Sequence, residues 1–335
     1  MKTLLCQKLG IELPIVQAPI GSATTPELAA AVSNAGGLGM LSVTWRSESE
    51  IRSIVRQTQS LTDKPFGVNL VLAFDIERKL KICLDEGVEV ISLFWGAPDL
   101  YVDLVHQAGA VVMHSVGDTL EAKQACNAGV DIVVAQGWEA GGHVRGKVST
   151  IALIPAVVDI VSPIPVVAAG GIADGRGILA ALALGASGVW LGTRFLASHE
   201  AKIHQVYLEN LLAAKVEDTV YSTLFDLGWQ NAPHRTLNNS TVKLWSAAGS
   251  PPSGDRPGEN EIIGHTSQGE AILRYSDTIP LPDTTGNLEQ LALYAGQSVG
   301  SIDSIDSSAE IIATLMAEIK VAYQSLQKII EHWLT

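Results

Sequence analysis

The feature that most constrains the fold is a strand–helix rhythm that repeats eight times between residues 14 and 197. Short runs rich in Val, Ile and Leu begin 21 to 33 residues apart, with helix-compatible stretches between them. The runs lack polar–apolar alternation, as expected for parallel strands buried on both faces. They begin near Pro14, Leu38, Pro65, Val88, Ala110, Asp131, Ile164 and Gly188. This pattern predicts a closed (β/α)8 or TIM barrel of the α/β class, with a doubly wound open sheet as the structural alternative.

The rhythm stops after Ala197, so we expect a chain in three parts. Residues 1–197 would form the barrel, and residues 198–300 a smaller, mostly helical cap. Residues 301–335 have apolar side chains at three- and four-residue spacing, which predicts a final helix that packs back on the barrel. The longest interval between strands holds the insertion EAGGHVRGKVS, and enlarged loops after barrel strands often carry function.

Composition excludes several other classes of protein. The chain has 22 Lys and Arg against 35 Asp and Glu, a net charge of −13, which argues against nucleic acid as a partner. We recognise no signal peptide and no apolar run long enough to span a bilayer, so we expect a cytoplasmic protein without a membrane partner. The three scattered cysteines suggest neither a disulfide framework nor a metal site.

Residues unusual for a buried strand collect where the predicted strands end. In chain order they are Ala18, Pro19, Asn69, His114, Ser115, Gln136, Gly170, Gly171, Gly192 and Thr193. The C-terminal ends of barrel strands share one face, and barrel active sites form there. We therefore expect these residues to surround a single site.

Two glycine-rich segments predict an anion site on this face. In AAGGIADGRG, backbone N–H groups could approach a phosphate closely, and the following helix N-terminus would add a favourable dipole. The segment GTRF after the eighth strand would complete the site. The structural alternative is a tight turn with a glycine cap. Asp174 is expected to cap the helix rather than to act as an acid.

Two amides and one imidazole are the candidates for chemistry. Asn69 and Gln136 lie in apolar runs, where they could brace neighbouring loops or meet a heterocycle with alternating donors and acceptors. His143 follows Gly141 and Gly142, and an imidazole pKa near 6.5 suits proton transfer. Most histidines are structural, and His114 is the second candidate because it also ends a strand.

Six motifs in order resemble the nitronate monooxygenase family: QAPIGSATTPELAAAVSNAGGLGML, PFGVNL, AQGWEAGGH, VVAAGGIADGRG, WLGTRF and LYAGQSVG. The resemblance covers about residues 11–300 and implies an FMN-bearing TIM barrel. It places FMN contacts at Ala18, Pro19, Asn69, Gln136, Gly141, Gly142, Gly170, Gly171, Trp190, Leu191, Gly192 and Thr193. It implies that His143 is the catalytic base and that Tyr294 lines the substrate pocket.

The chain departs from the family pattern at Ile20-Gly21-Ser22, which is less glycine-rich than usual, and at Trp190. Trp190 stands where the family often has Gln, so we expect backbone contacts from Leu191, Gly192 and Thr193 rather than a side-chain contact.

The resemblance implies oxidation of alkyl nitronates by O2, which gives an aldehyde or ketone and nitrite, by a monomer or homodimer that needs no metal. The alternative on the same barrel is an NAD(P)H-dependent FMN reductase of quinones or enoyl thioesters. A flavin-free aldolase or isomerase for a phosphorylated metabolite, and a barrel kept only as a scaffold, are the further alternatives.

Overall fold

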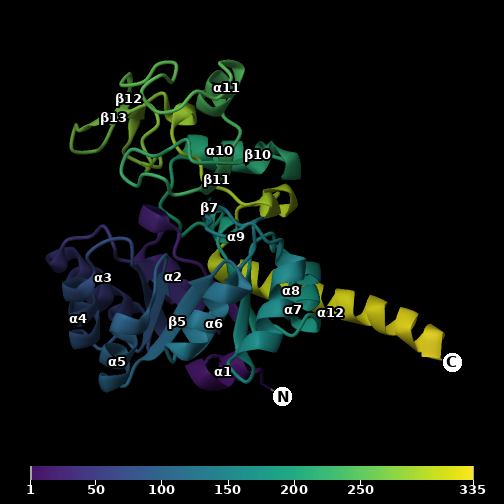
Figure 1. Ribbon diagram of the computed structural model, residues 1–335. Coiled ribbons are helices and arrows are strands. Elements are labelled where there is room, and N and C mark those ends of the chain that lie inside the picture. Colours follow the sequence, from purple (N-terminus) through teal and green to yellow (C-terminus); the bar gives the residue numbers. More distant parts are fainter. Residues whose placement is uncertain (1, 335) are drawn as a thin grey trace.

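The computed structural model describes residues 2–334, and its centre is a barrel of eight parallel strands. The strands are β1 (Ile15–Gln17), β2 (Gly39–Ser42), β3 (Phe66–Val71), β4 (Val90–Phe94), β5 (Val111–Val116), β6 (Ile132–Gln136), β8 (Val166–Ala169) and β9 (Gly188–Leu191). They pair in the order β1-β9-β8-β6-β5-β4-β3-β2. The ring closes where the Leu38 N–H donates to Ile15 O and the Gln17 N–H to Leu38 O, each at 2.9 Å. The predicted barrel is confirmed (Figure 1).

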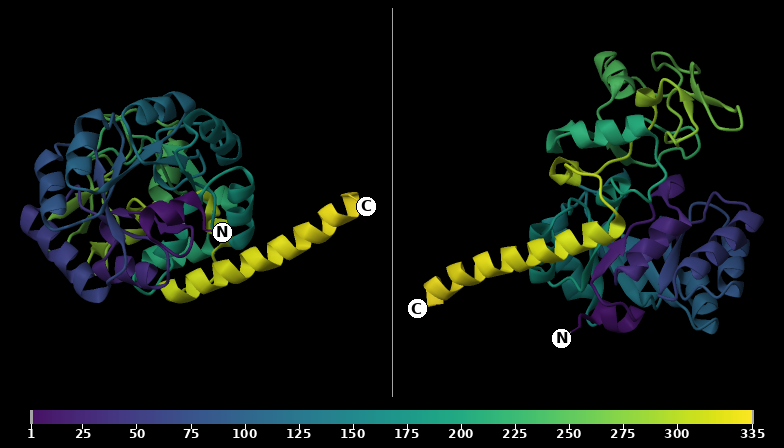
Figure 2. Two further views of the ribbon diagram at one scale, coloured as in Figure 1. Left: turned by 90° about the horizontal axis from the view of Figure 1, so that it is seen from below. Right: turned by 180° about the vertical axis from the view of Figure 1, so that it is seen from behind.

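Helices surround the strands, as the view along the barrel shows (Figure 2). They are α2 (Pro26–Asn34), α3 (Glu48–Leu61), α4 (Glu77–Asp85), α5 (Asp99–Gln107), α6 (Thr119–Asn127), α7 (Thr150–Val161), α8 (Gly175–Ala183) and the short α9 (Thr193–Leu196). The N-terminal α1 (Leu4–Leu9) places Leu5 and Leu9 against the interior residues Met40 and Met113. This helix covers the N-terminal end of the barrel, and the cavity described below lies at the opposite end.

Residues 198–300 lie over the C-terminal ends of the strands and form the cap (Figure 1). Its elements are α10 (Gln205–Ala213), β10 (Thr219–Ser222), β11 (His234–Leu237), α11 (Ser240–Ala247), β12 (Ile262–His265), β13 (Ala271–Leu273) and β14 (Thr285–Gly286). Short 3-10 helices occupy Gly21–Ala23, Val216–Asp218, Leu288–Gln290 and Gln297–Ser301. Besides its helices, the cap thus contains two small antiparallel sheets.

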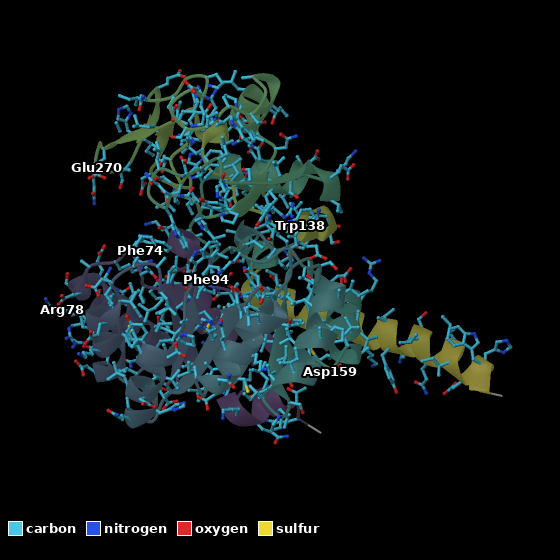
Figure 3. The ribbon with its side chains drawn as sticks, in the orientation of Figure 1. Phe74, Arg78, Phe94, Trp138, Asp159 and Glu270 are labelled. Atoms are coloured by element: carbon cyan, nitrogen blue, oxygen red, sulfur yellow. The ribbon has the colours of Figure 1, made fainter. Side chains whose placement is uncertain are left out.

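The insertion after β6 joins the barrel to the cap. Its strand β7 (Gly142–His143) pairs antiparallel with β11 of the cap. The Arg235 guanidinium lies 4.5 Å from the centre of the Trp138 ring and donates to Trp138 O at 2.9 Å. Figure 3 shows Trp138 at this junction. The insertion therefore belongs structurally to both parts of the molecule.

The last helix, α12 (Ser308–Leu334), packs against α8 and α2 through its first turns, where Ile311, Ile312 and Leu315 are buried. From Val321 onward it extends away from the barrel with exposed apolar side chains (Figure 2). No helix within residues 2–334 has both the length and the apolar character needed to cross a membrane.

Candidate active site at the mouth of the barrel

A cavity of about 430 Å³ lies between the strand ends and the cap. Its walls come from the loops after the barrel strands, from β7 and from the cap segment around residues 277–281. The structure brings together nearly all of the predicted site residues there: Ala18, Pro19, Asn69, Gln136, Gly141, Gly142, His143, Gly170, Gly171, Trp190, Gly192, Thr193 and Tyr294. The expected convergence on one mouth is therefore present in the geometry.

Strand alternation explains why two predicted residues do not reach this cavity. Leu191 follows the cavity-lining Trp190 on β9, so its side chain points outward into the layer between barrel and helices. Its carbonyl accepts a hydrogen bond from the Ala18 N–H at 2.9 Å, so that oxygen already has a structural partner. Because adjacent side chains of a strand point to opposite faces, His114 likewise points away from the lumen while Ser115 lines the cavity. Burial lowers the pKa of His114 to about 4.

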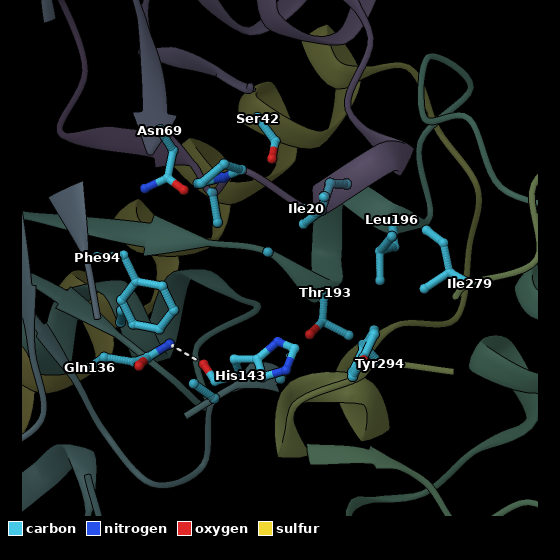
Figure 4. A pocket seen from close by; sticks show the side chains of 18 of the residues that line it. Ile20, Ser42, Asn69, Phe94, Gln136, His143, Thr193, Leu196, Ile279 and Tyr294 are labelled. Carbon is cyan, nitrogen blue, oxygen red and sulfur yellow. Dashed lines mark hydrogen bonds between the residues drawn. The ribbon is translucent and has the colours of Figure 1, made fainter. Parts of the chain in front are cut away.

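The side-chain amide nitrogens of Asn69 and Gln136 already donate hydrogen bonds within the protein. Asn69 Nδ2 donates to Ser92 O at 3.3 Å and to Ser92 Oγ at 3.2 Å. Gln136 Nε2 donates to His143 O at 3.1 Å, the dashed line in Figure 4. Their carbonyl oxygens have no hydrogen-bond donor among the described residues, so both can accept from N–H groups of a ligand.

A glycine-rich edge provides the anion-binding groups. Gly170 and Gly171 line the cavity with φ of 106° and 71°, a backbone region that favours glycine. Within residues 2–334, the N–H groups of Gly171 and Gly192 donate to no hydrogen-bond acceptor. They can therefore donate to a phosphate at this edge.

The N-terminus of α8 differs from the prediction. Asp174 Oδ1 accepts from the Gly177 N–H at 2.9 Å, so the expected cap is confirmed. A carboxylate oxygen of Glu318, from α12, accepts from the Gly175 N–H at 2.8 Å. Two carboxylates therefore accept from N–H groups in the first turn of α8. The prediction that this helix N-terminus favours binding of a phosphate is wrong, because these carboxylates already occupy it.

Gly141 is explained by packing rather than by ligand contact alone. A Cβ atom there would lie 2.3 Å from the Gly296 backbone nitrogen and 2.6 Å from Ala295 C. Only glycine lets the barrel insertion and the cap approach this closely. Thr193 strengthens the same junction, because its hydroxyl accepts from the Gly296 N–H at 3.0 Å.

His143 lies where barrel and cap meet. Its ring centre is 4.2 Å from that of Trp229, 5.6 Å from that of Tyr294 and 5.5 Å from that of His234. Its Nε2 is buried and has no hydrogen-bond partner among the described residues. Burial, with a smaller contribution from His234, lowers the pKa of His143 to about 3. The imidazole is therefore neutral at physiological pH and has an unused ring nitrogen.

Tyr294 keeps its proton, because complete burial raises its pKa well above the ordinary value. Its hydroxyl donates to Asp277 O at 3.3 Å. The Asp277 carboxyl also belongs to the cavity wall, and burial raises its pKa to about 6. No sequence pattern pointed to Asp277, or to Trp45 and Trp229, because these residues reach the cavity only through the fold.

The donor set fits a flat, phosphate-bearing heterocycle and does not suggest a metal. Two amide oxygens face the barrel side of the cavity, and unpaired N–H groups lie at its glycine edge. Among the described residues, no group of His, Cys, Asp and Glu side chains could hold a metal ion.

Comparisons with known proteins agree with this geometry. The sequence profile of the family described as "Nitronate monooxygenase" matches residues 2–77 and 72–318. A (3aS,4S,5R,7aS)-5-hydroxy-7a-methyl-1-oxo-octahydro-1H-indene-4-carboxyl-CoA dehydrogenase of Rhodococcus jostii is 40% identical over 74% of this chain and 69% of its own length. A nitronate monooxygenase of Paraburkholderia phytofirmans is 32% identical over 98% of both chains.

The solved structure of FabK from Thermotoga maritima is similar over 98% of this chain and 99% of that one, with a TM-score of 0.81 and 32% identity. The profile match spans most of the chain, and the P. phytofirmans relative is similar along nearly its whole length. The chain belongs to the nitronate monooxygenase family, and it is an oxidoreductase of a family of flavoproteins.

Proposed function

We propose that the chain binds FMN in the barrel side of the cavity and oxidises alkyl nitronates with O2, giving an aldehyde or ketone and nitrite. The observation that carries this proposal is the neutral His143, whose buried Nε2 lacks a partner at the edge of a cavity with phosphate- and heterocycle-binding groups. The match to the family and to a nitronate monooxygenase supports it.

The barrel residues divide the work of holding the cofactor. The N–H groups of Gly171 and Gly192 donate to its phosphate. The free carbonyl oxygens of Asn69 and Gln136 would be available as acceptors for the N–H of the flavin ring, while their amide nitrogens stay bound to Ser92 and His143. Bound FMN would supply an electron acceptor that can pass electrons on to O2.

His143 acts on the substrate. Being neutral, it can accept the proton from the carbon beside the nitro group of a nitroalkane. Its low pKa in the ligand-free cavity makes it a weak base, and an anion that forms beside it raises that pKa. The rings of Trp229 and Tyr294 exclude water on either side, and the bond from Gln136 to His143 O fixes the backbone position.

The second candidate is an NAD(P)H-dependent reductase of quinones or enoyl thioesters on the same barrel. The observation in its favour is the 40% identity to a protein named as a carboxyl-CoA dehydrogenase. The glycine edge and the amides would serve either reaction, because both reactions use the same cofactor.

Anaerobic mixing distinguishes the two functions. The purified yellow protein is mixed without oxygen with nitropropane nitronate, NADH or NADPH, and the flavin absorbance is followed. We expect the nitronate to bleach the flavin rapidly and, after air is admitted, to yield nitrite. Bleaching by NADH or NADPH with none by nitronate would overturn the proposal in favour of the reductase.

A further inference from the structure

Five aromatic side chains form a continuous surface beside the cavity, which we call the aromatic wall: Trp45, Phe74, Phe94, Trp95 and Trp229. They come from the loops after β2 and β3, from the end of β4 and from the cap. Neighbouring ring centres are 4.8 to 5.6 Å apart, with the rings steeply tilted to one another. Segments far apart in the sequence therefore build one apolar surface.

The aromatic wall leads directly to the imidazole. Trp229 lies 4.2 Å from His143 with 30° between the ring planes, and Trp95 lies 6.1 Å from it edge-on. Trp45, Phe94 and Trp229 line the cavity itself. A ligand in the cavity that contacts His143 therefore has its neighbouring atoms beside these rings.

Two features distinguish the aromatic wall from ordinary core packing. Trp45 is 54% exposed although it borders the cavity and touches Phe74 and Trp229, so part of its ring is open to a ligand. Trp95 has φ of 64°, a left-handed conformation that bulky residues rarely adopt. Such strained positions cluster at functional sites, where surrounding contacts hold them.

We propose that the substrate carries an aryl group, which the aromatic wall binds while the reacting carbon lies next to His143. Tilted aromatic rings attract one another beyond the area that they bury, so a phenyl group gains more here than an alkyl chain. The wall contains no charged side chain, so it selects for the ring rather than for an ionic tail. This inference rests on the proposed function, because it names the kind of nitronate that the site oxidises.

The first test compares the nitronates of 2-phenyl-1-nitroethane and 1-nitropropane. They share the reacting carbon and the methylene next to it, and they differ only in a terminal phenyl or methyl group. With the flavin-loaded enzyme we expect kcat/KM for the phenyl compound to be higher by on the order of tenfold, mainly through a lower KM. An equal value, or a higher one for nitropropane, would overturn the proposal.

Variants locate the preference. Trp45→Ala should bring the ratio of the two kcat/KM values close to one, whereas Trp45→Phe should keep most of it because a ring remains. Trp333→Ala, at a 73% exposed tryptophan near the end of α12, is the matched control and should leave the ratio unchanged. A ratio that survives Trp45→Ala would remove this residue from the site.

A binding test separates the failure of this inference from that of the proposed function. Phenylacetamide and propionamide, which cannot react, are titrated into the flavin-loaded protein while tryptophan fluorescence is measured. Tighter binding of phenylacetamide without any oxidation of nitronates would leave the aromatic wall standing and refute the proposed function. Oxidation of nitronates with equal binding of the two amides would refute only the aryl preference.

Discussion

The barrel and the cap contribute opposite kinds of chemistry to the same cavity. The barrel provides glycines and amides at strand ends, such as Gly171, Asn69 and Gln136. The cap provides bulky or ionisable side chains, Trp229, Asp277 and Tyr294 among its contributions. The first set suits a cofactor with a phosphate and a polar ring, and the second suits a substrate. The difference suggests that relatives can share a cofactor site on the strand ends, while the cap together with barrel-loop residues such as Trp45 decides which compound is oxidised.

The largest expected effect is at His143, which lies where the barrel insertion pairs with the cap. His143→Ala should lower turnover of nitroalkane by roughly 10²–10⁴-fold, because the general base is lost. Flavin content should stay near that of the wild type, because the barrel residues that hold the cofactor are untouched. Steady-state kinetics and the flavin-to-protein absorbance ratio measure the two quantities.

The control for this substitution is His265→Ala, at an exposed histidine of the cap. It should change neither quantity. A His143→Ala protein that turns over nitroalkane normally would remove the imidazole from the mechanism.

The next effect concerns the junction between the halves. Gly141→Ala places a Cβ 2.3 Å from the Gly296 backbone nitrogen, so barrel insertion and cap must move apart, at a cost of about 1–3 kcal/mol or more in unfolding free energy. Gly142→Ala meets nothing within 4 Å and costs only the strain of φ near 71°, about 1–2 kcal/mol. Chemical denaturation of both variants compares them. A smaller loss for Gly141→Ala would show that the junction is loose.

The smallest expected effect is electrostatic and confined to the cap. Burial, together with the charge of Asp226, raises the pKa of Asp277 from 3.8 to about 6. Asp226 itself is paired with Arg256 at 2.8 Å. Between these pH values the folded protein holds a proton that the unfolded chain has lost. Its stability therefore falls as pH rises from about 3.8 to about 6 and then stays level.

Asp277→Asn should abolish this fall, so the difference in melting temperature between variant and wild type should grow by a few degrees over that range. Asp283→Asn removes an exposed carboxylate from the same segment and serves as the control. A melting difference that does not change with pH would mean that Asp277 titrates normally.

The barrel was predictable because its information is local. Strands buried on both faces read as unbroken apolar runs, and Asp174 sits immediately before the helix that it caps. The alternation that turns Leu191 and His114 outward depends on strand register, which one residue of uncertainty reverses. Glu318 reaches the N-terminus of α8 from 143 residues away, so no motif could reveal that the helix end was already occupied.

The cap side of the cavity could not be predicted from local sequence patterns, because it too depends on contacts between distant segments. Trp229 and Asp277 stand in turns without periodic pattern, and their place depends on how two small sheets fold together. The left-handed backbone of Trp95 follows from packing around it rather than from its own preference. Tyr294 was predicted to line the substrate pocket only because of the family resemblance.

The strand that the insertion lends to the cap affects how small molecules enter and leave. The Val144 N–H donates to Pro233 O at 2.9 Å and the Gln297 N–H to Glu139 O at 2.9 Å, on either side of His143. If the cap moved away from the barrel, these hydrogen bonds would break and His143 would be displaced from the cavity. Small molecules would therefore enter with the cap in place, past Trp45, which lines the cavity and is 54% exposed.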